Sequence, residues 1–293
     1  MIGEALTHLL LKHNYKVIIL TRSLHQQKKI PGVEYALWNV AKKEIDMKAL
    51  VSANVIIHLA GAGVMDKAWS KAYKREIIHS RVDSLELIIN KLQSTTHSVQ
   101  TLISSSATGW YGKNTREPHT EEQLAGEGFL SEICKTWEGT ADKASELNIR
   151  VAKVRTGIVL SDQGGAYKEF RDPLKYGVAA ILGNGKQIVS WIDINDLCRI
   201  YLHLIENKLH GVFNAVAPWT VTNYQLVTLL AKLIKGKFYL PVYVPTFVLK
   251  VMYGERTEEI LKDVDVSCKK IKDTGFTFLY PSLESCIRHL EKL

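Results

Sequence analysis

The chain has 293 residues, 46% of them hydrophobic, and a formal net charge of +8 at pH 7. A chain of this length and apolar content can bury a full core without help from a metal or a disulfide. Its four cysteines are scattered and form no Cys-x-x-Cys pair, which favours a reducing compartment. The apolar runs are too short to span a membrane, and the N-terminus lacks a signal-peptide pattern. We therefore expect a cytoplasmic protein without a membrane partner.

The excess of basic residues raises the question of a nucleic-acid partner. Lys and Arg alternate with Asp and Glu along most of the chain, and no arginine-rich segment stands out. A solvated basic surface explains this charge, so we expect no nucleic-acid partner. An anionic small-molecule ligand stays open.

The first half of the chain alternates helical and strand patterns. Helices are expected over residues 3–13, 68–91 and 129–147. Strands are expected over residues 16–20, 33–38, 54–59, 100–104 and 150–155. Strands that alternate with helices indicate a parallel sheet with right-handed crossovers. The expected fold class is α/β, a Rossmann-like doubly wound parallel sheet with a smaller C-terminal substrate-side lobe.

The pattern changes after Leu160. Residues 161–187 are rich in glycine and charge and show no clear period. A strand over 188–192, a helix over 194–206 and a strand over 211–215 follow, and then short helices among prolines. We assign residues 1–160 and 188–216 to the Rossmann domain. We assign residues 161–187 and 217–293 to the substrate-side lobe.

The phosphate-binding turn of such a fold is incomplete in this sequence. The first strand and its glycine-rich turn normally form the pyrophosphate site at a helix N-terminus. Here Met1-Ile2-Gly3 opens directly at what should be the last glycine of a G-x-x-G-x-x-G turn. Either the sequence begins at an internal methionine, or the turn has been lost. We favour the first explanation, because a sheet without that strand would expose a strand position and lose nucleotide affinity.

The end of the second strand of the fold indicates which cofactor binds. The residue at this place meets the adenosine ribose, and an acid there favours NAD. This sequence instead has Thr21-Arg22-Ser23, with Lys28 and Lys29 close behind. A guanidinium can bind a 2′-phosphate through two hydrogen bonds. The sequence therefore favours NADP(H) over NAD(H), with an ordinary solvent-exposed arginine as the alternative.

Several motifs together resemble a known family. They are Ile57-His58-Leu59-Ala60-Gly61, Ser80-Arg81, the run from Leu102 to Gly112 with its three serines, Cys134 with Trp137-Glu138, Arg155–Leu160 and Trp191–Asp196. On these residues the chain is similar, over essentially its whole length, to the epimerase-family (YfcH-like) branch of the extended short-chain dehydrogenase/reductase superfamily.

The resemblance implies which residues lie at an NADP(H) site. Thr21 and Arg22 match the contact with the 2′-phosphate end, and Leu59-Ala60 match the loop over the adenosine and ribose. Glu76 and Arg81 match helical positions that border the cofactor, and Ile158 matches the chain that passes the nicotinamide. The full set of expected cofactor-binding residues is Gly3, Thr21, Arg22, Leu59, Ala60, Gly61, Glu76, Arg81, Ser104, Thr156 and Ile158.

The catalytic residues of the resembling superfamily are only partly matched. Its members use a Tyr-x-x-x-Lys helix motif, in which the Lys lowers the Tyr pKa, together with a Ser or Thr. Ser106 matches the hydroxyl that would bind the substrate oxygen. Leu130 and Cys134 occupy the Tyr and Lys positions, and Lys135 points about 100° around the helix. Tyr111 is a replacement candidate if it faces the nicotinamide, and a tyrosine packed beneath the nucleotide is equally consistent.

Other polar residues in these motifs have simpler interpretations. We expect Cys134 to be a buried helical cysteine, since no neighbour in sequence would form its thiolate. His58 and Trp137 are expected in the core, and Asp196 is expected to cap the helix that follows. Lys186 is the only cation near the Gly183-Asn184-Gly185 loop that could meet the diphosphate of a nucleotide sugar.

Three functions stay open from the sequence. The first is an NADP(H)-dependent oxidoreductase or epimerase acting on a small carbonyl, hydroxyl or nucleotide-sugar substrate through Ser106 and Tyr111. The alternative is a non-catalytic NADP(H)-binding sensor or scaffold protein, which Leu130 and Cys134 favour. The third is a nucleic-acid-associated protein. The sequence specifies neither the substrate nor the oligomeric state.

Overall fold

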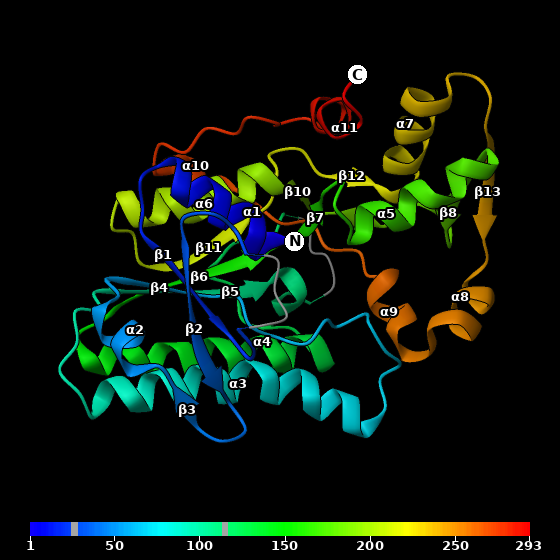
Figure 1. Ribbon diagram of the computed structural model, residues 1–293. Coiled ribbons are helices and arrows are strands. Elements are labelled where there is room, and N and C mark those ends of the chain that lie inside the picture. Colours follow the sequence, from blue (N-terminus) through cyan, green and yellow to red (C-terminus); the bar gives the residue numbers. More distant parts are fainter. Residues whose placement is uncertain (25–28, 113–116) are drawn as a thin grey trace.

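The computed structural model describes residues 1–24, 29–112 and 117–293. Its centre is a four-stranded parallel sheet in the order β11-β6-β5-β4. The strands are β4 (Val55–His58), β5 (Thr101–Ala107), β6 (Arg150–Thr156) and β11 (Gly211–Ala215). Helices α3 (Lys71–Gln93) and α4 (Phe129–Asp142) cover one face, and α1 (Ile2–Lys12) and α6 (Ile194–Glu206) cover the other (Figure 1). The expected Rossmann-like doubly wound α/β fold is confirmed.

A second sheet carries the N-terminal strands. β1 (Val17–Thr21) and β2 (Val33–Asn39) pair in parallel, and β3 (Glu44–Ile45), just before α2 (Met47–Ser52), pairs antiparallel with β2. β1 and β4 each end their sheet, so in the described part of the chain each has one unpaired edge. Their side chains are mostly half-buried, whereas those of the interior strand β5 are mostly buried. The strands at these two edges are therefore less covered than the interior strand β5.

Local sequence signals explain most element boundaries. Helix α3 begins after Ser70, whose side chain accepts a hydrogen bond from the Tyr73 N–H. The expected single helix over 129–147 is wrong in its last part. Helix α4 ends at Asp142, and the 3-10 helix η2 (Lys143–Leu147) continues to Asn148, which adopts a left-handed conformation (φ 58°).

Residues 161–187, which show no clear period in the sequence, contain regular structure. They form α5 (Ala166–Arg171), the 3-10 helix η3 (Asp172–Tyr176) and β8 (Val178–Leu182), which pairs in parallel with β13 (Leu240–Val244). The expected strand over 188–192 is two strands. β9 (Ile188–Val189) pairs with β12 (Val221–Thr222), and β10 (Trp191–Asp193) pairs with β7 (Ile158–Leu160). These partners are distant in sequence, so local patterns do not reveal them.

A second core lies beside the sheet. It is formed by β8, α5, α7 (Asn223–Lys235) and the C-terminal helix α11 (Leu283–Glu291). After β13 the chain forms α8 (Thr246–Tyr253), η4 (Gly254–Arg256), α9 (Thr257–Ile260) and α10 (Lys269–Asp273). The segment from Val264 to Phe278 packs against the first core with α6 and β11. Among the described residues, none of the helices combines the length and apolar character needed to cross a bilayer.

Candidate functional site

The candidate site lies where β1, β4 and α1 meet. Gly3 is in the first turn of α1, and a Cβ added to it would lie 3.7 Å from Leu59 Cδ1, just after β4. Thr21, the last residue of β1, is buried, and Arg22 directly after it is exposed. Arg22 forms no ion pair with the residues that the structure describes, and Lys28 lies outside them. The guanidinium at this strand end is therefore available to an anion.

The loop after β4 is held by two residues of α3. The Ala62 N–H donates to Ser80 Oγ at 2.9 Å, and Arg81 Nη1 donates to Ala62 O at 3.0 Å and Ile77 O at 2.9 Å. A Cβ on Gly61 would lie 2.8 Å from Arg81 Cζ, so any other residue at this position would force the Arg81 side chain to shift. Ser80 and Arg81 therefore hold the backbone at Ala62, directly after the Leu59-Ala60-Gly61 loop.

Glu76 lies away from this clamp. Its carboxylate is exposed and lies 3.5 Å from Lys67 Nζ. The Arg81 guanidinium, in contrast, is buried and lies 4.9 Å from the centre of the Trp137 ring. The assignment of both residues to the border of the cofactor stays a prediction.

The serine-rich end of β5 is turned mainly inward. Ser104 is fully buried, and its Oγ donates to Ser105 O at 3.1 Å. Ser105 is half-buried, and its Oγ lies 2.5 Å from Tyr201 Oη. The Ser106 hydroxyl donates to Glu138 Oε1 at 2.6 Å, in a buried site. Of the three hydroxyls, only that of Ser105 belongs to a residue with partial exposure.

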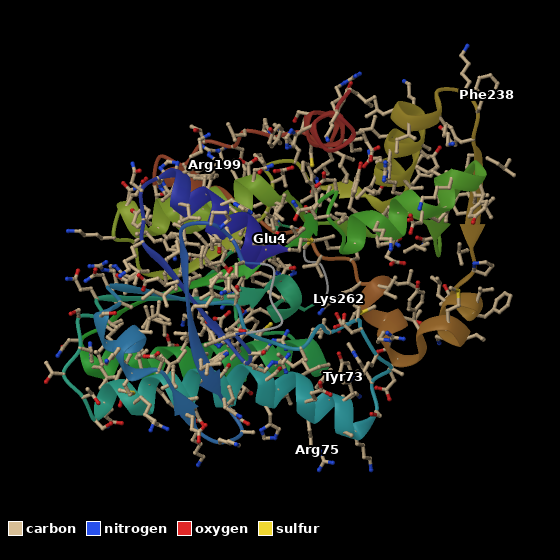
Figure 2. All side chains as sticks on the ribbon, viewed as in Figure 1. Glu4, Tyr73, Arg75, Arg199, Phe238 and Lys262 are labelled. Carbon is tan, nitrogen blue, oxygen red and sulfur yellow. The ribbon has the colours of Figure 1, made fainter. Side chains whose placement is uncertain are left out.

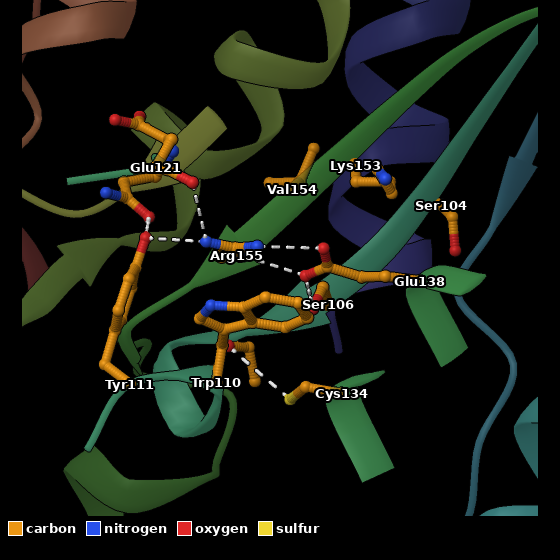
Figure 3. A network of polar contacts seen from close by, with 12 residues as sticks. Ser104, Ser106, Trp110, Tyr111, Glu121, Cys134, Glu138, Lys153, Val154 and Arg155 are labelled. Carbon is orange, nitrogen blue, oxygen red and sulfur yellow. Dashed lines mark hydrogen bonds and ion pairs between the residues drawn. The ribbon is translucent and has the colours of Figure 1, made fainter. Parts of the chain in front are cut away.

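Ser106 is one member of a buried polar network around Arg155 (Figure 3). Arg155 Nε and Nη2 donate to the two carboxylate oxygens of Glu138 at 2.8 and 3.0 Å. The two side chains are only 3% and 4% exposed. Arg155 Nη1 donates to Tyr111 Oη at 3.1 Å and Glu121 O at 3.2 Å. The Trp110 ring lies 3.8 Å from the guanidinium carbon, so every side of this cation has a partner.

Tyr111 belongs to the same network. Its hydroxyl donates to Asn214 Oδ1 at 2.6 Å, and its ring is fully buried. Burial raises the pKa of Tyr111 to about 12, against the opposing effect of Arg155. Of the two alternatives that the sequence leaves for Tyr111, this geometry favours the packed tyrosine. Its role as a proton donor stays a prediction that this burial disfavours.

The helix positions of the missing Tyr and Lys are apolar in character. A Cβ on Gly109 would lie 3.0 Å from Leu130 Cβ and 3.8 Å from Cys134 Sγ, so both face the end of β5. Burial, and then the nearby Glu138, raises the pKa of Cys134 to about 11. Lys135 is turned away and pairs with Glu132 at 2.6 Å. The prediction of a buried helical Cys134 is confirmed.

The chain crosses the site again between β6 and β7. A Cβ on Gly157 would lie 2.4 Å from Ser190 O, so only glycine permits this close approach of the two chain segments. Thr156 before it is half-buried, and Ile158 after it is 37% exposed. An exposed isoleucine at the start of β7 provides an open apolar surface for a ligand.

Two further expectations have clear outcomes. The cap of α6 is Asp193, whose Oδ1 accepts from Asn195 N at 2.7 Å. Asp196 instead accepts hydrogen bonds from Leu279 N and Tyr280 N, so its expected capping role is wrong. His58 and Trp137 are buried in the core, as predicted.

The central pair of the network, Arg155 and Glu138, was missed as a functional unit by sequence reasoning. The sequence did contain an indication, because Glu138 and Arg155 are charged residues among the buried residues of a helix and a strand. Nothing in the sequence shows that the two meet, since the pair joins β6 to α4.

The structure has the architecture of a Rossmann-type α/β protein. The model of the NAD dependent epimerase/dehydratase family matches residues 1–132, and a domain of unknown function (DUF1731) matches residues 244–290. An epimerase family protein of Staphylococcus haemolyticus is 31% identical over 292 residues, which cover 99% of this chain and 95% of that protein. One from Staphylococcus aureus is 32% identical over 294 residues, covering 99% and 95%. The chain therefore belongs to the epimerase family.

Solved structures show the same fold. Human epimerase family protein SDR39U1 (isoform 2), crystallised with NADPH, matches with a TM-score of 0.84 and 24% identity, over 100% of this chain and 97% of that one. UDP-glucose 4-epimerase of Thermotoga maritima, crystallised with UDP-glucose, matches with a TM-score of 0.77 and 19% identity, over 100% and 96%.

Proposed function

We propose that this chain is an NADP(H)-dependent oxidoreductase or epimerase of the extended short-chain dehydrogenase type. Its substrate class would be a small carbonyl or hydroxyl compound or a nucleotide sugar. The observation that carries the proposal is Arg22, an exposed guanidinium without an ion pair among the described residues, at the carboxyl end of β1. Ligands of open α/β sheets bind at this end of the strands. The NADPH in the crystals of SDR39U1 supports the same choice.

The residues around Arg22 fit a dinucleotide. Leu59 and Ala60 are half-buried and follow β4, so they offer apolar contact to an adenosine. Gly3 at the start of α1 keeps the helix N-terminus close to this loop. Ile158, open on its outer side, fits the place of a nicotinamide. When bound, NADP(H) supplies or accepts a hydride.

The proton chemistry is assigned to Ser106 and Tyr111 in this proposal. Both hydroxyls are donors to buried acceptors, Glu138 and Asn214 respectively. Either hydroxyl must exchange that acceptor for a substrate oxygen before it can act in catalysis. Ser105 directly precedes Ser106, carries a hydroxyl and is partly exposed. It is therefore a further candidate for contact with the substrate.

A specific observation favours a second function, a non-catalytic NADP(H)-binding sensor or scaffold. Leu130 and Cys134 occupy the acid–base positions, and the raised pKa of Cys134 keeps its thiol protonated. A chain that binds the cofactor but moves no proton would report NADP(H) without consuming it.

One experiment separates the two functions. Fluorescence titration of the full chain with NADPH measures binding, and a panel of carbonyl compounds and nucleotide sugars measures turnover. The enzyme proposal predicts saturable binding and turnover that Ser106→Ala and Tyr111→Phe both reduce at least ten-fold, in line with general acid–base contributions of roughly 10²–10⁴. Turnover that survives both substitutions would remove these residues from catalysis. Tight binding without turnover would favour the sensor or scaffold.

A further inference from the structure

A bare apolar surface lies at the end of the molecule formed by β8, β13 and α8. In Figure 1 β13 runs along one edge of the molecule and leads into α8, and Figure 2 shows Phe238 at the other end of the strand. Large hydrophobic side chains here are 37–86% exposed. We call this the β13–α8 surface, and its members are Phe238, Leu240, Val242, Phe247, Val251 and Met252. Contiguous exposure of this kind marks an interaction site.

The β13–β8 ribbon buries one face of β8, whereas Pro241 and Tyr243 of β13, which pair with Ala179 and Ile181, are exposed. Side chains of paired residues in register lie on the same face of a parallel ribbon. Ala179 and Ile181 of β8 are buried in the core that contains α7. The opposite face carries only aliphatic side chains, which are Val178, Ala180 and Leu182 from β8 and Leu240, Val242 and Val244 from β13. Leu240 and Val242 are exposed and the other four are half-buried, so the described residues cover this face only in part.

Helix α8 extends the same surface. Phe247 and Val251 are 70% and 86% exposed and stand four residues apart, so they share one side of the helix. Lys250 lies on that side as well, three residues after Phe247. Leu249, on the other side, is buried and anchors the helix to the protein.

The segment that forms β13 and α8 carries only basic charges, and the first acidic residue after it is Glu255. No Asp or Glu occurs from Asn207 to Gly254. Lys235, Lys237 and Lys250 lie within or beside the β13–α8 surface, and none of them forms an ion pair with a described residue. An apolar surface edged by unpaired lysines is complementary to an apolar layer with an anionic boundary.

The outer edge of β13 is poorly suited to pairing with a strand of another chain. Leu240 N donates to Gly177 O, and Val244 O accepts from Gly183 N, so the even-numbered residues of β13 face β8. The outward positions include Pro241 and Pro245, which have no N–H to donate. A second copy packed face to face would also bring the unpaired lysines of both copies to one interface. The geometry therefore disfavours a protein strand or a second copy as the occupant.

We propose that the β13–α8 surface docks on the surface of a lipid bilayer that contains acidic phospholipids. Phe247, Val251 and Leu240 enter the boundary between headgroups and acyl chains, while Lys237 and Lys250 contact the acidic headgroups. This contact is peripheral and needs no membrane-spanning helix. The expectation of no membrane partner rested on the absence of a spanning segment, so it does not address this mode of binding.

Vesicle co-sedimentation of the full chain tests the proposal. Vesicles of phosphatidylcholine alone are compared with vesicles that also contain phosphatidylglycerol. We expect binding to the second kind only, with marked weakening in high salt, where screening removes the attraction between exposed charges. Phe247→Ser with Val251→Ser should abolish binding. Lys237→Gln and Lys250→Gln should each weaken it roughly five-fold, because one lysine near an anionic surface is worth about 1 kcal/mol.

Matched controls keep the test specific. Leu124→Ser changes a side chain that is 90% exposed elsewhere, and Lys48→Gln removes an exposed charge on α2, so neither should affect vesicle binding. Unchanged circular dichroism and melting temperature show that the variants stay folded. Failure to bind anionic vesicles, or equal binding to both kinds, overturns the proposal. A dimer in analytical ultracentrifugation that Phe247→Ser and Val251→Ser abolish, without vesicle binding, would identify a second copy as the occupant.

Discussion

Arg155 and Glu138 form a two-point ion pair, at 2.8 and 3.0 Å, in the protein interior between β6 and α4. The Ser106 hydroxyl donates a hydrogen bond to the Glu138 carboxylate of this pair. The pair also connects to Tyr111, so both residues assigned to catalysis take their orientation from it. The positions of these side chains therefore depend on the Arg155–Glu138 ion pair, whose two buried charges neutralise each other.

Removal of one partner should be strongly destabilising. Glu138→Ala leaves the Arg155 guanidinium buried without its counter-charge, and we expect a loss of about 3–5 kcal/mol in the free energy of unfolding. Urea denaturation measures this loss. The exposed pair between Lys143 and Glu86, at 2.9 Å, provides the control, and Glu86→Ala should cost less than about 1 kcal/mol. Equal losses for the two variants would contradict the role assigned to the pair.

The close contact between Gly61 and Arg81 should make the fold sensitive to a side chain at position 61. A Cβ at position 61 would lie 2.8 Å from Arg81 Cζ, so Gly61→Ala should destabilise the fold by about 1–3 kcal/mol and weaken NADPH binding. In an Arg81→Ala background the same change should cost much less, which a double-mutant cycle measures. Gly139→Ala is the control, because a Cβ there meets nothing within 4 Å in the middle of α4. It should stabilise by roughly 0.5–1 kcal/mol. Additive losses at positions 61 and 81 would show that the clamp does not exist.

His58 should make the fold sensitive to acid. Its Nε2 lies 2.8 Å from Ser84 Oγ, whose own proton has backbone acceptors, so Nε2 carries a proton and donates it to Ser84 Oγ. Burial, and then the nearby Arg81, lowers the pKa of His58 to about 3. Below pH 6.5, the ordinary pKa of histidine, His58 binds a proton in the unfolded chain but not in the folded chain. The stability that is present above pH 6.5 is therefore lost as the pH falls toward 3.

The expected slope is about 1.4 kcal/mol per pH unit in that window. Urea denaturation between pH 7 and 4 measures it. His58→Asn should flatten the profile, and His79→Asn, which changes an exposed histidine on α3, should leave it unchanged. A profile that keeps its slope in His58→Asn would exclude His58 as the source.

The sequence predicts the sheet elements of the Rossmann core well, because buried parallel strands such as Val55–His58 are apolar and are followed by helices with a clear period. It predicts the second lobe poorly, since β8 and β13 pair across more than fifty residues and neither has a local partner. For the site, the first turn of α1 at Gly3 lies close to Leu59, and the cofactor roles given to both residues stay predictions.

The inward orientation of Ser106 and Tyr111 could not be predicted. It follows from the Arg155–Glu138 pair, which forms only when β6 packs against α4. A motif of serines at the end of a strand specifies where the hydroxyls lie along the chain, and the tertiary packing decides which of them is exposed. Asp196 shows the same limit, because its partners, the backbone N–H groups of Leu279 and Tyr280, are more than eighty residues away.

The most direct test of the account is the cofactor preference of the Arg22→Ala variant. Dissociation constants for NADPH and NADH, each measured by fluorescence on the full chain, give a ratio that isolates the 2′-phosphate. We expect Arg22→Ala to weaken NADPH binding by roughly ten- to hundred-fold, as for a charge-assisted hydrogen bond, and to leave NADH nearly unchanged. Arg75→Ala, an exposed arginine on α3 (Figure 2), should change neither value. An equal loss for both cofactors, or no loss for either, would contradict the assignment of an NADP(H) site to the carboxyl end of β1.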